Sequence, residues 1–478
     1  MSNSTYTDDS RKTIRTAAWN TVANVLSLVI STLAVIATTR MMSQNELGTA
    51  ATFLANRNTL DIVVTLAIYS YVNKGLVSHE DDETNFVASL TAFCAVSILF
   101  FFLIAFPFKS LIQNLLSLDD FLFYWLFPSL LSYSLFLIAN YYCIYTNQTG
   151  LVFWMVMATG PISQILSIAL IACMPNCTHI GRVIGLDSAY VIIAAILLIY
   201  LIRKRKGINC RCFLAYAKES LLFTIPLIPH LLSQMVITQF DLTLISNLAG
   251  ADKSGIYSMG HTIGNLAFTM LSQIMCAWSP WVYRRLRDNN TALVKAGSKY
   301  LLLLGLWLSC GLITISPEMV HLLLPPDYYP TITIVPALVF SMYLQFLFLF
   351  EYDLEYYHKR TGWIAAGSSI AAGVNIALDI ALIPVFGYQI ACIATCISCL
   401  VLVGFNLIEA RKIGFQKYYN LKAMVVTTIC LAAFAVTSLV FEHSILVRYT
   451  SMVTLTVILY TIAKPFISML IKNRRSHA

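Results

Sequence analysis

Long apolar runs separated by short polar segments dominate the pattern of this chain. Runs of about 20 residues recur, which is the length that an α-helix needs to cross the hydrocarbon core of a bilayer. Prolines lie within or at the ends of the fifth, seventh, tenth and eleventh runs and predict local kinks. We expect about fourteen membrane spans, with approximate limits at 17–39, 47–71, 86–106, 121–143, 151–174, 182–202, 219–241, 254–280, 298–316, 331–352, 362–384, 387–408, 421–441 and 445–470.

The segments between the runs predict an orientation. If the N-terminus is cytoplasmic, 25 of the 31 Lys and Arg residues fall in cytoplasmic segments and five in outer loops. Cytoplasmic loops of membrane proteins carry such an excess of basic residues. Because the bias alternates from loop to loop, it favours an even number of spans and places both termini in the cytoplasm.

Composition excludes a water-soluble class. The chain is 58% hydrophobic and 11% charged, whereas soluble domains carry about 25% charged residues. The net charge of +8 comes from short basic loops between spans, so it does not indicate nucleic-acid binding. No loop exceeds roughly 20 residues, so no loop has room for a soluble catalytic or binding domain of about 50 residues or more. The sequence has no P-loop, nucleophile elbow or zinc signature, so we expect no cofactor and place the function within the helix bundle.

An internal repeat predicts two lobes. Leu47-Gly48 opens the second run and Ser254-Gly255 opens the eighth, and the offset of 207 residues places Asn58 over Asn265. Two further pairs of positions recur at nearly the same offset, Tyr145 with Tyr357 and Gly181 with Gly387. Six spans return the chain to the same side of the membrane, which predicts parallel repeats about an axis normal to it. The predicted division is an N-terminal lobe at 1–205, a second lobe at 206–412 and two additional spans at 413–478.

Arg57 is the one basic residue that lies well inside an apolar run. A charge at that depth costs about 2.5–3.5 kcal/mol, so it must face protein or water rather than lipid. Asn58 and Asp61 share its helical face, which is therefore predicted to face inward. Two interpretations stay open: Arg57 binds an anionic substrate at mid-membrane, or Asp61, one turn away, neutralises it in a structural pair.

Other polar residues within the runs are the remaining candidates for a site. Amides that could bind sugar hydroxyls, together with Arg57 and Asn58, are Gln234, Asn265 and Asn375, although such residues also tie helices together. Buried carboxylates favour the protonated form and can bind a coupling ion, and the candidates are Asp61, Asp379 and Asp241. Asp241 lies at the end of a run, so it could equally be an interfacial residue.

Several short motifs resemble the polysaccharide-exporter and O-antigen flippase branch of the multidrug/oligosaccharidyl-lipid/polysaccharide flippase superfamily. They are Asp241-Leu-Thr-Leu-Ile-Ser-Asn-Leu-Ala-Gly250 with Ser254-Gly255-Ile256-Tyr257, and Asn375-x3-Asp379 through Ile383-Pro384 to Ile390-Ala391-Cys392-Ile393-Ala394-Thr395. Cys392 departs from the usual Gly-Ala-Ala pattern of that branch. The resemblance covers nearly the whole chain.

The resemblance implies an all-α transporter of the bacterial inner membrane with two lobes around a central cavity. Its relatives move polyprenyl-diphosphate-linked oligosaccharides, such as O-antigen units, from the cytoplasmic to the periplasmic leaflet by alternating access. It further implies H⁺ or Na⁺ as a coupling ion, membrane lipids around the bundle, and polysaccharide polymerase and chain-length proteins as partners. The diphosphate would explain a buried Arg57.

Three alternatives remain open from the sequence. A drug or cation exporter of the same superfamily would have a net acidic site. A membrane-embedded glycan polymerase or acyltransferase would need a long outer loop or a reactive His/carboxylate pair, and neither is evident, so we expect no enzyme. A scaffold would not need Arg57.

Overall fold

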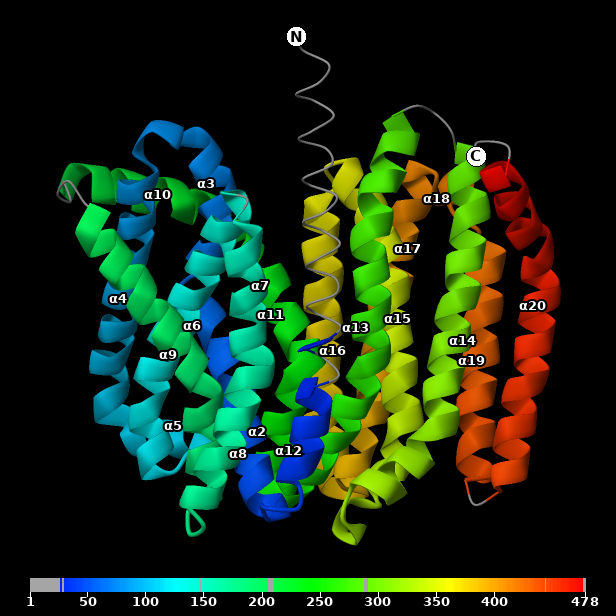
Figure 1. Ribbon diagram of the computed structural model, residues 1–478, viewed down its shortest axis with the longest axis horizontal. Coiled ribbons are helices and arrows are strands. Elements are labelled where there is room, and N and C mark those ends of the chain that lie inside the picture. Colours follow the sequence, from blue (N-terminus) through cyan, green and yellow to red (C-terminus); the bar gives the residue numbers. More distant parts are fainter. Residues whose placement is uncertain are drawn as a thin grey trace. The chain divides into compact units, whose positions relative to one another are not determined.

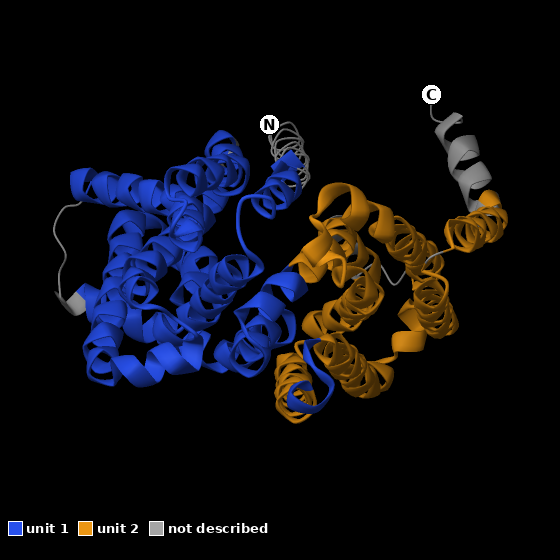
Figure 2. Ribbon diagram, turned by 90° about the horizontal axis from the view of Figure 1, so that it is seen from below, with its two compact units in different colours: residues 1–258, 383–388 blue, residues 259–382, 389–478 orange. Residues whose placement is uncertain are grey.

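The computed structural model describes residues 26–27, 30–146, 148–204, 210–287, 291–442 and 444–475. This part of the chain contains helices and no strand. The chain forms two compact units, shown in Figure 2. Unit 1 comprises residues 1–258 and 383–388, and unit 2 comprises residues 259–382 and 389–478.

Unit 1 is built from helices that follow one another with short connections (Figure 1). The helices are α2 (Gln44–Val64), α3 (Val72–Ser78), α4 (Glu83–Ala105), α5 (Lys109–Leu116), α6 (Asp120–Tyr145), α7 (Thr149–Met157), α8 (Ser163–Cys173), α9 (Thr178–Lys204), α10 (Cys210–Thr224), α11 (Ile228–Met235), α12 (Asp241–Ala249) and the first turns of α13 (Ala251–Arg287).

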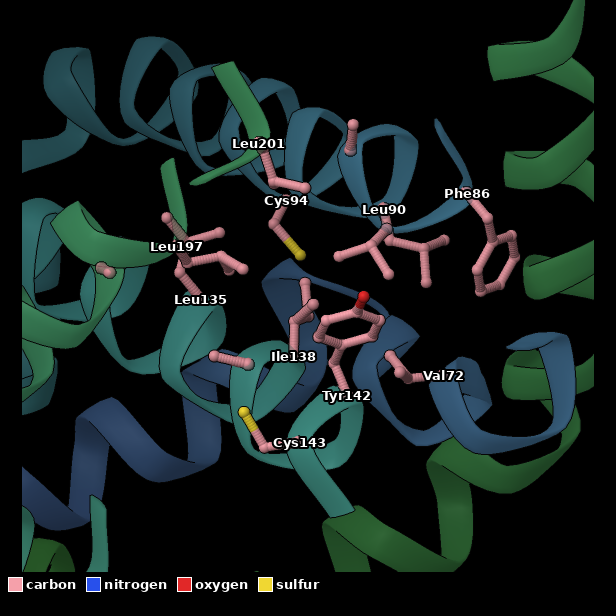
Figure 3. Packing of buried hydrophobic residues seen from close by; sticks show 14 of the residues in the cluster. Val72, Phe86, Leu90, Cys94, Leu135, Ile138, Tyr142, Cys143, Leu197 and Leu201 are labelled. Atoms are coloured by element: carbon pink, nitrogen blue, oxygen red, sulfur yellow. The ribbon is translucent and has the colours of Figure 1, made fainter. Parts of the chain in front are cut away.

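A closely packed apolar cluster holds α3, α4, α6 and α9 together (Figure 3). Leu90 and Cys94 of α4, Ile138 of α6 and Val72 of α3 are all inaccessible to solvent. Leu197 of α9 closes the cluster on another side. Burial of this kind fixes side-chain positions, because protein interiors are packed about as densely as organic crystals. The cluster therefore gives the polar residues of the neighbouring α2 a rigid frame.

Unit 2 continues with α13 and six further helices, α14 (Thr291–Leu323), α15 (Thr331–Tyr357), α16 (Thr361–Phe386), α17 (Ala391–Ile413), α19 (Leu421–Val440) and α20 (Ile445–Arg475), with the single turn α18 (Phe415–Tyr418) between α17 and α19. Helix α15 is the central element of this unit, since 83% of its most apolar 18-residue stretch is buried inside the structure. The last two helices belong to this unit: Tyr343 of α15 donates to Thr427 of α19 at 2.7 Å, and Trp307 of α14 donates to Thr456 of α20 at 3.1 Å.

Within the residues that the structure describes, eleven helices are long and apolar enough to cross a membrane, or up to twelve if the bent pair Gln44–Val64 and Ile68–Ser78 forms one span. Of the fourteen predicted spans, the first lies largely outside the described residues. The eighth corresponds to α13, a helix of 37 residues that is not among the eleven. The all-helical, multi-span prediction is confirmed, whereas the count of fourteen, the central cavity and the division at 205 and 412 remain predictions.

Prolines change the local helix type at some positions and not at others. Pro161 lies in a π-helical segment, Ala158–Ile162, between α7 and α8, and Pro226 lies in the turn between α10 and α11. Pro336 and Pro384 lie inside α15 and α16, which continue through them. In the fifth and seventh runs the prolines therefore lie in short π-helical and 3-10 segments of otherwise continuous helices, and in the tenth and eleventh runs the α-helix continues through them.

Two glycines on which the predicted internal repeat rests contact each other. A Cβ atom added to Gly48 of α2 would lie 1.7 Å from the carbonyl oxygen of Ala251. A Cβ atom added to Gly255 of α13 would lie 2.1 Å from the carbonyl oxygen of Gln44. Such approach of two backbones is possible only without side chains, as at small-residue crossings of membrane helices. Positions 207 residues apart in sequence thus meet at one crossing of α2 and α13.

Candidate functional site

Helix α2 carries the polar residues of the candidate site. Ser43 accepts a hydrogen bond from the backbone N–H of Glu46, and the Glu46 side chain reaches back to the Ser43 backbone, so a capping box begins the helix. The helix ends at Val64, because Leu66 and Ala67 adopt left-handed backbone conformations with φ of 53° and 49°. The chain then bends by 63° into the next helical segment. The polar stretch from Thr52 to Asp61 therefore belongs to one regular helix.

Arg57 is buried within unit 1 and forms an ion pair with Asp187 of α9. The side chain of Arg57 is 5% exposed and that of Asp187 is fully buried. The guanidinium also donates from Nη2 to Oδ1 of Asn58 at 3.0 Å and from Nε to the same oxygen at 3.3 Å. A buried charge requires this combination of an opposite charge and hydrogen bonds. Asp187 thus neutralises the charge of Arg57 within unit 1.

Two tyrosine rings enclose the guanidinium of Arg57. Its Cζ atom lies 4.5 Å from the ring centroid of Tyr133 on α6 and 5.1 Å from that of Tyr190 on α9. The two rings meet edge to face, with centroids 5.3 Å apart. Desolvated cation–π contacts are worth about 2 kcal/mol or more. The cation therefore has an aromatic cage as well as a carboxylate partner.

Asp187 and Asp61 have separate partners. The second oxygen of Asp187 accepts a hydrogen bond from Nε1 of Trp125 at 2.9 Å. Asp61 accepts a hydrogen bond from the Ser134 hydroxyl of α6, and its Oδ2 atom is buried with no hydrogen-bond partner among the described residues. The interpretation in which Asp61 forms the structural pair with Arg57 is therefore wrong, because Asp187 holds the guanidinium and Asp61 faces Ser134.

A line of hydrogen bonds joins α2 to the segment around α12. Asn58 donates to Oε1 of Gln239 at 2.9 Å, and the Asn56 side chain accepts from the Thr243 hydroxyl at 2.7 Å. The Thr52 and Ser254 hydroxyls lie 3.1 Å apart. Interhelical hydrogen bonds of this kind contribute about 0.6 kcal/mol on average within membranes. Asn58 thus contacts both Arg57 and Gln239.

The other predicted site residues divide between the two units. Within unit 1, Gln234 is half-buried on α11, and Asp241 is buried at the start of α12, where it accepts from the Tyr257 hydroxyl at 2.7 Å. Within unit 2, Asn265 is half-buried on α13, whereas Asn375 and Asp379 are fully buried one turn apart on α16. The structure thus brings Arg57 together with Asn58, and Asn375 together with Asp379.

Sequence reasoning missed the residues that surround Arg57. In the sequence, Asp187 is recognisable only as a carboxylate inside the sixth apolar run. Nothing in the sequence distinguishes Tyr133, Tyr190 and Trp125 from the many other aromatic residues. The pairing of Asp187 with Arg57 spans 130 residues and depends on the packing of α2 against α9. One sign was available, because an acidic residue within a span requires a partner and Arg57 was the single cation at that depth.

Unit 2 contains a second group of buried acidic residues near the end of α15. Asp353 accepts hydrogen bonds from Ser279 at 2.6 Å and Tyr283 at 3.0 Å. Glu351 and Glu355 are fully buried, and their carboxylate oxygens have no hydrogen-bond partner in the part of the chain that the structure describes. Burying a polar group without a hydrogen bond is costly, so Glu351 and Glu355 occupy unusual positions for carboxyl groups.

Comparisons with known proteins agree on the architecture. A family model described as polysaccharide biosynthesis protein matches residues 13–285. Among solved structures, the lipid II flippase MurJ in an inward closed conformation is 16% identical, with a TM-score of 0.72 over 94% of this chain and 99% of that one. The MATE transporter VcmN of Vibrio cholerae, in its bent form, is 13% identical, with a TM-score of 0.52 over 86% and 98%.

A third similar structure is a MOP superfamily transporter from Pyrococcus furiosus, which is 11% identical with a TM-score of 0.54 over 84% of this chain and 96% of that one. No curated protein matches the chain. At these identities the structural likeness concerns the fold alone.

Proposed function

This chain belongs to the polysaccharide biosynthesis protein family, and from that premise we propose that it flips a lipid-linked oligosaccharide across the membrane. The proposed substrate is a polyprenyl-diphosphate-linked unit, such as an O-antigen unit, which moves from the cytoplasmic to the periplasmic leaflet. The family and the fold are those of transporters and flippases rather than of catalytic enzymes. The MurJ-like fold supports a lipid-linked cargo.

The observation that carries the proposal is the buried Arg57 on α2. An intramembrane cation is costly and is a functional-site hypothesis by default. A diphosphate offers the bidentate oxygen geometry that a guanidinium fits. The polyprenyl tail would remain in the bilayer, while the charged and sugar-bearing head crosses the protein. Asn58 and Gln239, together with Gln234, Asn265 and Asn375, are the proposed hydrogen-bond donors and acceptors for the head group.

Asp187 has a defined role in this proposal, because a flippase must return without its cargo. An unpaired Arg57 would then be a bare charge in a low-dielectric interior, which is strongly destabilising. Asp187 supplies a resident anion that the diphosphate replaces and that pairs with Arg57 again after release. The Tyr133 and Tyr190 rings keep the guanidinium in place during the exchange.

We propose that buried carboxylates bind the coupling ion. Asp61 is one candidate for H⁺ or Na⁺, because one of its oxygens is buried without a partner in the described structure. Asp379, one turn from Asn375, is another candidate, and Asp241 is a third. The basic cytoplasmic loops support an inner-membrane orientation with both termini inside. Polysaccharide polymerase and chain-length proteins are the proposed partners.

A second candidate function is export of a cationic drug, and one observation favours it. Arg57 is neutralised by Asp187, whereas Asp61 of the same unit is a buried acidic residue for which no salt bridge is described. An ionised Asp61 would offer a cation an opposite charge. Loss of Arg57 would leave such an exporter more acidic inside and would not weaken binding of a cation.

The test is lipid extraction from cells that lack this protein and carry wild type, Arg57→Ala or Asp187→Asn. We expect polyprenyl-linked glycan to accumulate in the cytoplasmic leaflet of cells without the protein, and we expect wild type but not Arg57→Ala to prevent this accumulation. If both proteins prevent it, Arg57 has a structural role alone. Absence of accumulation without the protein would overturn the glycan proposal, and altered sensitivity to cationic drugs would then support the exporter. Membrane levels of each variant serve as the folding control.

A further inference from the structure

An apolar cavity of about 310 Å³ opens on unit 1 between α6, α7 and α9. Its lining includes Tyr142, Trp154, Ala158, Ile196 and Tyr200, and it is almost entirely apolar. Figure 3 shows Tyr142, Cys143 and Leu197 from the neighbouring core, which form part of its wall. The volume lies at the lower end of the range for ligand sites, about 300–1,000 Å³. No residue proposed for glycan transport lines it.

The cavity faces the surroundings of the helices rather than the interior of the unit. Trp154 is 63% exposed and Ile196 is 61% exposed, although both belong to helices long and apolar enough to span a membrane. Large apolar side chains that are exposed on such helices face hydrocarbon. An empty apolar hollow there would lose dispersion contacts along its lining, so a hydrocarbon chain is the occupant that its chemistry favours.

The cavity runs along the helices toward their ends. Ile192 and Tyr200 both line it and lie eight residues apart on α9, which corresponds to about 12 Å along the axis. The Tyr142 and Tyr200 hydroxyls lie 3.1 Å apart and mark its polar end. The long dimension of the cavity therefore follows the direction in which lipid chains lie.

Two cations follow directly after this polar end. Arg203 and Lys204 are exposed in the last turn of α9, and Nζ of Lys204 lies 5.1 Å from the Tyr200 ring centroid. The basic segment that continues from them is predicted to be cytoplasmic. The cytoplasmic leaflet carries anionic lipids, and each basic residue near its surface attracts them. An apolar cavity one turn from two cations is complementary to a lipid that has a chain and an anionic head.

We propose that this cavity is a binding site for an anionic phospholipid of the cytoplasmic leaflet. One acyl chain lies between α6, α7 and α9, and the phosphate lies at Arg203 and Lys204. The site is separate from the proposed transport route and does not depend on which cargo the protein moves.

The first test is native mass spectrometry of the full chain, titrated with phosphatidylglycerol or phosphatidylcholine. We expect one tight phosphatidylglycerol adduct, and Arg203→Gln with Lys204→Gln should weaken it about thirtyfold. The matched control is Arg411→Gln with Lys417→Gln, which changes one basic residue in the last turn of α17 and one in α18; neither lines the cavity, so binding should not change. Equal binding of both lipids, or equal binding by the Arg203/Lys204 variant, would overturn the proposal.

The second test locates the chain. Ala158→Phe should fill the cavity and weaken the adduct about tenfold or more, whereas Ile165→Phe, on the exposed face of α8, should not.

Brominated phosphatidylglycerol should quench tryptophan fluorescence. Trp154→Phe, which is safe for folding at an exposed position, should remove more of that quenching than Trp307→Phe. Equal quenching in the two variants would overturn the location. Displacement of phosphatidylglycerol by one equivalent of polyprenyl phosphate would overturn the phospholipid assignment in favour of the cargo's own chain.

Discussion

Arg57 on α2 and Asp187 on α9 form a buried ion pair between residues 130 positions apart in the sequence. The pair fixes two membrane helices to each other and leaves the interior of unit 1 with less net charge than the sequence indicates. Buried pairs seldom add stability over well-packed apolar residues, but a single remaining partner is costly. This asymmetry allows a structural role to be separated from a role in transport.

Removing one partner of the pair should destabilise the protein more than removing both. Arg57→Ala should lower the free energy of unfolding by about 3–5 kcal/mol, because Asp187 would then be an uncompensated buried charge. Arg57→Met combined with Asp187→Leu should recover most of that loss. Thermal unfolding in detergent measures both variants. If the double variant restores stability but not glycan transport, Arg57 has a role beyond packing; equal loss in the single and double variants would contradict the charge argument.

Asp61→Asn should leave the fold intact and remove ion dependence. The asparagine oxygen can still accept the hydrogen bond from Ser134, but its NH2 group would replace Oδ2, which has no partner in the described structure, so the free energy of unfolding should fall by about 1–3 kcal/mol. Transport into vesicles under an imposed H⁺ or Na⁺ gradient provides the measurement. Ser134→Ala is the complementary control, since it removes the hydrogen bond between Ser134 and Asp61 but keeps the carboxylate. Gradient-driven transport that persists in Asp61→Asn would exclude Asp61 as the coupling residue.

Two acidic residues on the same helix should respond to the same substitution with opposite signs. Glu351 is fully buried without a donor in the described structure, so Glu351→Leu should raise the free energy of unfolding by about 1–3 kcal/mol. Asp353→Leu should lower it by a similar amount, because the Ser279 and Tyr283 hydroxyls lose their acceptor. Thermal unfolding midpoints compare the two variants. Destabilisation by Glu351→Leu would show that this carboxyl group has a ligand.

Gly48→Ala should be far more damaging than an equivalent change at Gly373. The new Cβ atom at position 48 would overlap the Ala251 carbonyl, and separating the helices should cost about 1–3 kcal/mol or more. A Cβ atom added to Gly373 would have no heavy atom within 4 Å, so Gly373→Ala should be neutral or stabilise α16 by about 0.5–1 kcal/mol. Yields of folded protein and unfolding midpoints provide the measurement. Comparable behaviour of the two variants would contradict the close crossing.

The sequence predicted well what depends on local pattern. Apolar runs of spanning length identified the helices, because a segment in lipid must satisfy its own backbone hydrogen bonds. The position of Arg57 well inside an apolar run identified it as a charged residue that needs partners within the protein. The motifs Leu47-Gly48 and Ser254-Gly255 predicted only an internal repeat, and their close backbone approach is visible only in the structure.

Partners that come from distant helices could not be predicted. Asp61 is one turn from Arg57 and is its natural partner in an isolated helix. In the folded unit the packing of α2 against α9 brings Asp187 to the guanidinium, and α6 offers Ser134 to Asp61. Helical periodicity identifies the face that turns inward but not the element that it meets. The aromatic cage of Tyr133 and Tyr190 has no sequence signature for the same reason.

The mutual contact of Gly48 and Gly255 has a consequence for the ancestry of the chain. If the two repeats descend from one shorter chain that assembled as a pair, these residues were one position, and that glycine touched its own copy on the two-fold axis. In such a self-complementary contact every substitution acts twice. Duplication and fusion would then have freed the two copies to diverge, and this chain has a residue without a side chain at both positions.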